Sequence, residues 1–76
     1  MDQFEQFAVR YDMGHFSVEK RGPDQWAVTR YGSCLNIDGE FEYEPSPSNR
    51  DDDFIARTRF TKGRAFELVQ ELLKSD

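Results

Sequence analysis

Cysteine and histidine are almost absent from this chain, which holds one of each among its 76 residues. Cys34 has no partner for an internal disulfide, which is typical of proteins from reducing compartments. Cys34 and the single histidine, His15, also fall short of the four ligands that a structural zinc site needs. We therefore expect no disulfide, no zinc centre and no cofactor.

Long apolar runs are absent too. No stretch approaches the roughly 20 apolar residues of a membrane-spanning helix. The first residues, Met1 to Glu5, lack the basic and apolar regions of a signal peptide. We expect no membrane association and a cytoplasmic location. The length allows one domain, residues 1–76, with residues 1–6 predicted to be frayed.

Proline is scarce, and two of the three prolines, Pro45 and Pro47, fall in one acidic, serine-containing segment, residues 44–53. Each proline fixes its own φ angle and pushes the preceding residue toward extended backbone. A strand is therefore not expected to continue past Tyr43, and residues 44–53 are predicted to form a loop.

Aromatic residues, by contrast, are plentiful: seven Phe, three Tyr and one Trp. Apolar and polar residues alternate in short stretches that predict strands at 16–20, 26–31, 34–37 and 41–43. In the last two stretches we expect Leu35, Ile37, Phe41 and Tyr43 to face inward. Asp38-Gly39 between them predicts a type I′ hairpin turn. Together these features predict an antiparallel meander of three to five strands.

The clearest helix lies at the end of the chain, over residues 62–74. Ala65, Leu68, Val69 and Leu72 follow the i, i+3, i+4, i+7 spacing of an apolar helix face. Thr61 precedes them as a candidate N-cap. A sheet and a helix must each bury one face. We therefore predict an α+β fold in which one C-terminal helix packs on one face of a small antiparallel sheet.

The segment 54–60 fits two structures. Phe54, Ala56, Thr58 and Phe60 alternate with Ile55, Arg57 and Arg59, which favours a half-buried strand. The alternative is a short helix capped by Ser48 or Asn49, with Asp51 to Asp53 in its first turn. We take the strand as the prediction.

Charge is distributed unevenly, although the whole chain carries a net charge of −5. Residues 38–53 hold seven acids and one base, a net charge of −6, and residues 54–64 hold four bases and no acid. The acidic candidates for partner binding are Glu40, Glu42, Glu44, Asp51, Asp52 and Asp53. The candidates for anion binding are Arg57, Arg59, Lys62 and Arg64. We expect Asp51 to Asp53 to pair with these bases.

One resemblance covers residues 16 to 73. It rests on Trp26-Ala-Val, Gly32-x-Cys-Leu-Asn, the run from Gly39 to Phe54, Arg57-Thr-Arg-Phe and the C-terminal helix. This pattern resembles a group of short hypothetical proteins from bacteriophages and prophages. The resemblance implies a bacterial host cell and an accessory role, and it transfers no functional residue.

Catalytic and metal-binding patterns are weak. Asn49, Asp51 and Asp53 match the first positions of a calcium loop, but Phe54 stands where that loop needs glycine and Phe60 where it needs glutamate. Nothing in the sequence brings Cys34 and His15 together as a nucleophile and its base. We expect no metal site and no enzymatic activity.

Three functions fit these observations. The first is a small interaction module, from a phage or a bacterium, that binds a protein partner through the acidic residues. The second is a nucleic-acid accessory domain that uses the basic residues of segment 57–64, although the acidic pI of about 4.7 disfavours this. The third is a structural domain that associates with copies of itself. We favour a monomer, because the glutamates of one strand would repel those of a second copy.

Overall fold

The structure, a computed structural model, describes residues 9–75. The segment predicted to be frayed, residues 1–6, lies outside this range. Five strands form one antiparallel sheet in chain order, a meander. The elements are β1 (Arg10–Met13), β2 (Phe16–Gly22), β3 (Gln25–Arg30), β4 (Ser33–Leu35), β5 (Phe41–Tyr43), the 3₁₀-helix η1 (Pro47–Asn49), α2 (Asp52–Thr58) and α3 (Lys62–Ser75). The predicted α+β class is confirmed, with a second helix added before the C-terminal one.

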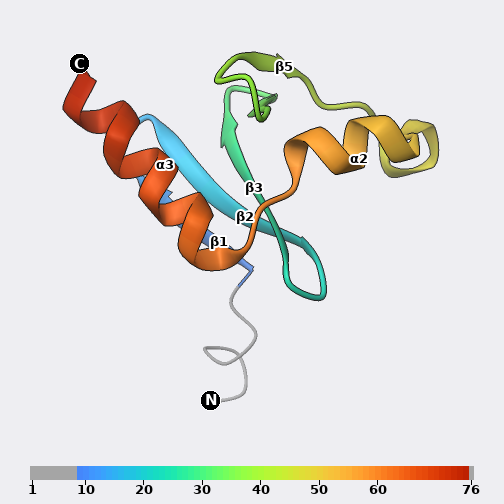
Figure 1. Cartoon of the computed structure of the whole chain (residues 1–76), viewed down its shortest axis with the longest axis horizontal. Coiled ribbons are helices and arrows are strands. Elements are labelled where there is room, and N and C mark those ends of the chain that lie inside the picture. Colours follow the sequence, from blue (N-terminus) through green and yellow to red (C-terminus); the bar gives the residue numbers. More distant parts are fainter. Residues whose placement is uncertain (1–8, 76) are drawn as a thin grey trace.

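The main core lies between the sheet and α3, which packs on β2 and β3 (Figure 1). Val18 and Val28 stand opposite each other on neighbouring strands and are fully buried. From α3, Ala65 and Val69 complete this layer with no exposed surface. The predicted helix is confirmed, and Thr61 caps it by accepting a hydrogen bond from Arg64 N at 3.2 Å.

The other face of the sheet is covered only in part. Ala27 and Cys34 point to this face and are nevertheless fully buried. Phe54 and Thr58 of α2 are buried as well, and Figure 1 shows α2 beside β3, away from α3. We conclude that α2 covers this part of the second face, while the part formed by β1 and β2 stays open.

Residues 54–60 do not form the predicted strand. Asp51 is an N-cap whose Oδ1 accepts a hydrogen bond from Phe54 N at 2.8 Å, so the helical alternative holds with a cap different from Ser48 or Asn49. Phe54 and Thr58 are the two buried positions, four residues apart, and Ala56 is exposed. A capped acidic first turn outweighs the weak alternation here. Within this segment only Arg59 and Phe60 follow the helix. Arg59 is extended, and Phe60 pairs with Trp26 at the edge of β3.

The type I′ turn lies elsewhere than predicted. Arg30 and Ser33 pair across a two-residue turn, and both central residues, Tyr31 (φ 49°) and Gly32 (φ 83°), have positive φ. At Asp38-Gly39 only the glycine has positive φ. β4 and β5 are therefore joined by a longer loop, residues 36–40, instead of a tight hairpin.

Two side chains predicted to face inward do not. Ile37 lies in the loop and is 67% exposed, and Tyr43 on β5 is 77% exposed. The reason is the position of α3, which packs on β2 and β3 and leaves the end of the meander outside the helix-covered core. Phe41, by contrast, is partly buried and packs against the core.

Candidate functional site

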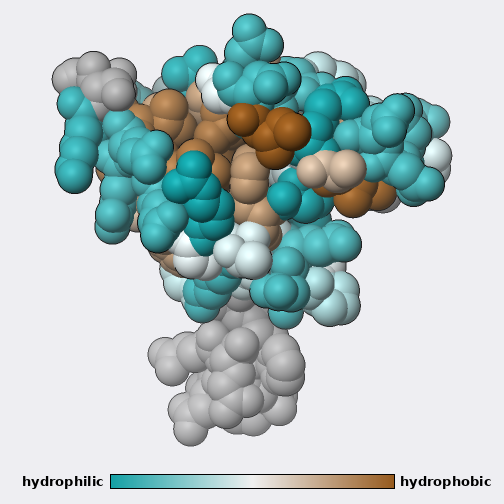
Figure 2. All heavy atoms as spheres, viewed as in Figure 1, coloured by the Kyte–Doolittle hydropathy of each residue, from teal (hydrophilic) through white to brown (hydrophobic). Residues whose placement is uncertain are grey.

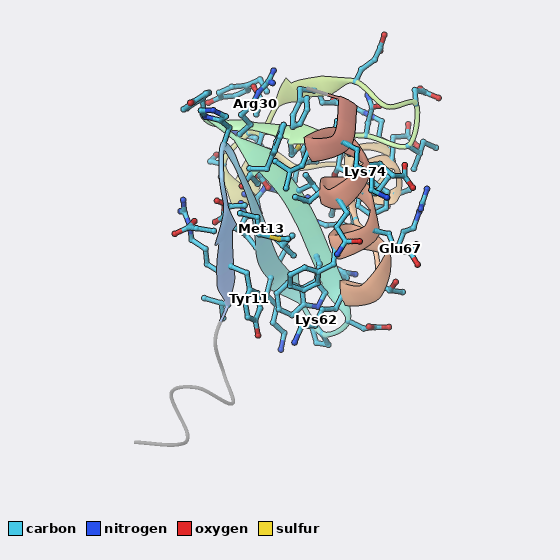
Figure 3. All side chains as sticks on the ribbon, turned by 90° about the vertical axis from the view of Figure 1, so that its left-hand side faces the viewer. Tyr11, Met13, Arg30, Lys62, Glu67 and Lys74 are labelled. Atoms are coloured by element: carbon cyan, nitrogen blue, oxygen red, sulfur yellow. The ribbon has the colours of Figure 1, made fainter. Side chains whose placement is uncertain are left out.

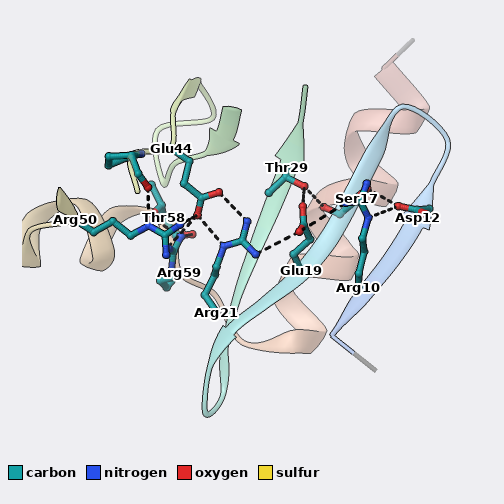
Figure 4. A network of polar contacts seen from close by, with 11 residues as sticks. Arg10, Asp12, Ser17, Glu19, Arg21, Thr29, Glu44, Arg50, Thr58 and Arg59 are labelled. Atoms are coloured by element: carbon teal, nitrogen blue, oxygen red, sulfur yellow. Dashed lines mark hydrogen bonds and ion pairs between the residues drawn. The ribbon is translucent and has the colours of Figure 1, made fainter. Parts of the chain in front are cut away.

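Glu44 follows β5 and binds three arginines at once. Its carboxylate accepts hydrogen bonds from Arg21 at 2.7 and 2.8 Å and from Arg59 at 3.1 Å, and Arg50 lies 3.4 Å away (Figure 4). The side chains of Glu44 and Arg59 are only 10% and 6% exposed. The hydrogen bonds from Arg21 hold the pKa of Glu44 below its ordinary value, whereas burial lowers the pKa of Arg59. Glu44 is therefore committed to an internal cluster.

Glu42 on β5 is committed as well. Its two carboxylate oxygens accept hydrogen bonds from Arg57 at 2.8 and 2.9 Å, and Asn36 Nδ2 donates a third at 2.9 Å. The Arg57 bonds are the main cause that lowers the pKa of Glu42 to about 2, with Asn36 next. The predicted acidic residues thus divide into two groups. Glu42 and Glu44 neutralise Arg57 and Arg59, whereas the other four make no ion pair among the described residues.

The three aspartates do not pair with the basic segment as predicted. Asp51 caps α2, and Asp52 and Asp53 in the first turn of that helix are exposed. Within residues 9–75 none of the three makes an ion pair of 4 Å or less, although the charges of Asp51 and Asp53 help to raise the pKa of Arg57. The physical reason is the helical geometry of residues 52–58, which holds the aspartates at the start of α2.

The remaining bases are dispersed. Arg64 lies 3.2 Å from Glu67 and 3.5 Å from Glu71, both on its own helix. Lys62 Nζ lies 3.2 Å from Tyr11 Oη and above the rings of Tyr11 and Trp26 (Figure 3). The four predicted anion-binding side chains therefore contact four different sets of neighbours and do not converge on one site.

Loop 36–40 is held by the side chain of Asn36. Asn36 Oδ1 accepts hydrogen bonds from the backbone N–H groups of Asp38 at 2.9 Å and Glu40 at 3.0 Å. Backbone bonds from Asn36 N to Glu40 O and from Gly39 N to Asn36 O close the loop. Asp38 and Glu40 are exposed and make no ion pair within the described part of the chain. They add to the free negative charge of Asp51, Asp52 and Asp53.

An apolar groove runs between this loop and α3. It consists of two hollows of 490 and 180 Å³ that share Gly39 and Leu68. Figure 2 shows hydrophobic atoms gathered on this face of the molecule, next to α3. The groove was not predictable from the alternation of apolar residues, because that pattern places Ile37 in the core. The sequence does contain one indication of the loop. Asn36 stands two residues before Asp38, and an Asn side chain can accept a hydrogen bond from the backbone two residues further on, which forms a turn.

A polar hollow of 650 Å³ occupies the open part of the second sheet face. The acids of its lining are paired: Asp12 accepts from Arg10 and Ser17, and Glu19 accepts from Thr29 and Arg21 (Figure 4). No buried side-chain nitrogen or oxygen among the described residues lacks a hydrogen-bond partner. Such a network of paired polar side chains is typical of a solvent-facing sheet surface, where it stabilises the fold, and less typical of a reactive site.

The candidate nucleophile is not activated. Cys34 is fully buried, and burial is the main cause that raises the pKa of its thiol. His15 lies instead in an exposed turn, with Nδ1 3.3 Å from Tyr31 Oη. Residues 9–75 contain no cluster of three His, Cys, Asp or Glu side chains arranged for a metal ion. In the same range, no helix has both the length and the apolar character to cross a membrane.

The fold and these surfaces define a class: a small α+β protein whose five-stranded meander carries a helix on each face and whose loop 36–40 and α2 start carry exposed acids. No protein family, curated protein or solved structure matches the chain. The resemblance of residues 16–73 to short bacteriophage proteins stays a prediction.

Proposed function

We propose that this protein is a non-enzymatic interaction module that binds a basic surface of a partner protein. The acidic surface consists of Asp38, Glu40, Asp51, Asp52 and Asp53. The observation that carries the proposal is the division of charges: Arg57 and Arg59 are neutralised by Glu42 and Glu44, whereas these five acids are exposed and unpaired in the described part of the chain.

This division leaves exposed negative charge in loop 36–40 and at the start of α2. Unpaired surface charges of one sign attract a partner of the opposite sign and speed its association. The module needs no catalytic group for such a role. The buried Cys34 and the mutually paired charges of the polar hollow accord with binding more than with catalysis.

The test is a pull-down from a bacterial lysate with the immobilised protein, with recovered proteins quantified by mass spectrometry. Glu40→Gln, Asp52→Asn and Asp53→Asn, singly and combined, should lower the recovery of a defined partner and leave Asp51 to cap α2. Asp24→Asn is the control, because Asp24 is exposed in the β2–β3 turn, outside the acidic surface. Equal recovery by the combined variant would refute the acidic surface.

Nucleic-acid binding is the second candidate, and the ion pairs of Arg57, Arg59 and Arg64 weaken it. We expect no gel shift of single- or double-stranded DNA or RNA at low salt with about 0.1 mM protein, a concentration at which non-specific binders are usually detected. A shift that disappears on Arg57→Gln and Arg64→Gln would reverse the order of the two candidates.

A further inference from the structure

The apolar groove beside α3 brings the exposed side chain of Ile37 together with partly buried apolar side chains that pack against the core. It is lined at its apolar positions by Leu35, Ile37, Phe60, Leu68 and Leu72. Ile37 is 67% exposed although it belongs to an ordered loop. Contiguous apolar surface with a polar rim is typical of an interaction site, whereas single exposed apolar residues are ordinary.

The groove is formed in advance of binding. All five backbone N–H groups of residues 36–40 donate to internal acceptors, including Ile37 N to Arg57 O at 2.8 Å. Ile37 is thus fixed against α2 on one side and against the Asn36 turn on the other. A partner that docks here does not have to order the loop, which removes one cost of association.

The same hydrogen bonds restrict the kind of partner. A partner strand would need free backbone groups on the loop, and the N–H groups of residues 36–40 are all occupied. The partner must therefore bind through its side chains. Between Arg64 and Leu72 the groove follows α3 for about 12 Å, at 1.5 Å per residue, which matches roughly two turns of a second helix.

The charges at the rim determine the sign of the partner. Asp38 lies at one end of the groove and Glu71 at the other, and Glu40 is exposed on the loop. Arg64 is the one basic residue of the lining, and Glu67 and Glu71 already neutralise it. Arg64 and its two glutamates together carry a net negative charge, and Asp38 adds to it. The rim is therefore negative, and it complements lysine or arginine beside an apolar helix face.

We propose that this groove is the docking site for a basic amphipathic helix of about two turns from a partner protein, with apolar anchors at i, i+4 and i+7. The proposal rests on the protein-binding function above and identifies the partner segment that this function would use. Ile37 and Leu68 contact the apolar anchors, and the exposed carboxylates of Asp38 and Glu40 lie opposite basic side chains of the helix.

The probe is a fluorescein-labelled peptide of leucine and lysine, about 14 residues long and thus roughly four helical turns, with leucine at i, i+3, i+4 and i+7. Fluorescence anisotropy should show saturable binding in the micromolar range. Ile37→Ser should weaken binding at least about tenfold, because it removes a central apolar contact. Tyr43→Ser, at a similarly exposed position outside the groove lining, should leave the affinity unchanged.

Two further peptides separate the apolar face from the charge. A scrambled sequence of the same composition and a counterpart with glutamate for lysine should both bind at least about tenfold more weakly. In ¹⁵N-labelled protein, the original peptide should shift the amide signals of Ile37, Gly39, Leu68 and Leu72 most. Equal binding of the scrambled peptide, equal effects of the two serine variants, or shifts confined to other residues would each overturn the proposal.

The failure of this proposal is distinguishable from that of the proposed function. A partner recovered from the lysate whose binding depends on Asp52 and Asp53 but not on Ile37 leaves the acidic surface intact and refutes the groove. A concentration-dependent dimer in sedimentation that Ile37→Ser abolishes refutes it as well, because the groove would then bind a second copy of the chain.

Discussion

Glu44 joins parts of the chain that are far apart in sequence. It lies just after β5, and its three arginines come from β2, from the residue after η1 and from the residue after α2. Three guanidinium groups face one carboxylate in a site with little solvent access. Without the carboxylate these positive charges would repel one another where water screens them poorly.

Glu44→Gln should therefore lower the free energy of unfolding by about 3 kcal/mol, the usual cost of removing one partner from a largely buried ion pair. Glu40→Gln is the matched control at an exposed, unpaired position and should change it by less than about 0.5 kcal/mol. Urea denaturation followed by tryptophan fluorescence measures both. Similar losses in the two variants would show that the cluster does not stabilise the fold.

Tyr31 occupies a backbone conformation that suits other residues better. It is 85% exposed at the first central position of a type I′ turn, where asparagine and glycine are preferred. Tyr31→Asn should raise the free energy of unfolding by about 0.5–1 kcal/mol, because asparagine adopts positive φ at lower cost.

Gly32→Ala in the same turn should lower the free energy of unfolding by about 1 kcal/mol. A Cβ atom there would meet nothing within 4 Å, so backbone conformation alone would account for the change. Thermal unfolding of the two variants shows whether Tyr31→Asn raises the stability and Gly32→Ala lowers it. A loss of stability in Tyr31→Asn would mean that the Tyr31 ring or its bond to His15 outweighs the cost of the turn.

At the scale of elements, α2 depends on the side chain that caps it. It has seven residues, too few to be stable alone, and Asp51 satisfies one of its free N–H groups. Its other support is the burial of Phe54 and Thr58 against the second sheet face. Cap and packing together hold Arg57 and Arg59 in reach of β5.

Asp51→Ala should lower the free energy of unfolding by about 1 kcal/mol, whereas Asp51→Asn, which keeps a capping oxygen, should cost only a few tenths. Chemical denaturation gives both values, and circular dichroism reports the helix content. Equal losses would mean that the negative charge, and not the capping hydrogen bond, is what stabilises this end of α2.

For the whole molecule, ion pairs connect the sheet to the helical half of the chain, and this makes stability depend on pH. Glu42 has its pKa lowered to about 2 from an ordinary value of 4.5, and the pKa of Glu44 is lowered as well. A carboxyl with a lower pKa in the folded state stabilises the fold fully above its unfolded pKa, and this contribution is lost as the pH falls toward the folded value.

The free energy of unfolding should therefore be constant from pH 7 to about 5 and fall steadily between about pH 4.5 and 2. Urea denaturation at intervals across this range measures the slope. Glu42→Gln should flatten part of it, because that position no longer titrates. A wild-type curve that stays level down to pH 2.5 would contradict the assigned ion pairs.

The sequence by itself determined the features that depend on local pattern. Alternation in 16–20 and 26–31 predicted β2 and β3, because a strand with one buried face repeats every two residues. The apolar spacing from Ala65 to Leu72 and the cap at Thr61 predicted α3 for the same kind of reason. The order of strands followed from short connections, so the α+β meander was predictable.

Only the tertiary structure decided which charges remain free. Glu40, Glu42 and Glu44 are alike in sequence, yet Glu42 and Glu44 bind Arg57 and Arg59, which α2 brings to the second sheet face. Glu40 lies in the loop before β5 and stays exposed. The exposure of Ile37 is also decided by the tertiary structure, because α3 packs on β2 and β3 and does not bury the loop that holds Ile37. Ion pairing and burial are set by distances between segments far apart in the chain, and no local pattern contains those distances.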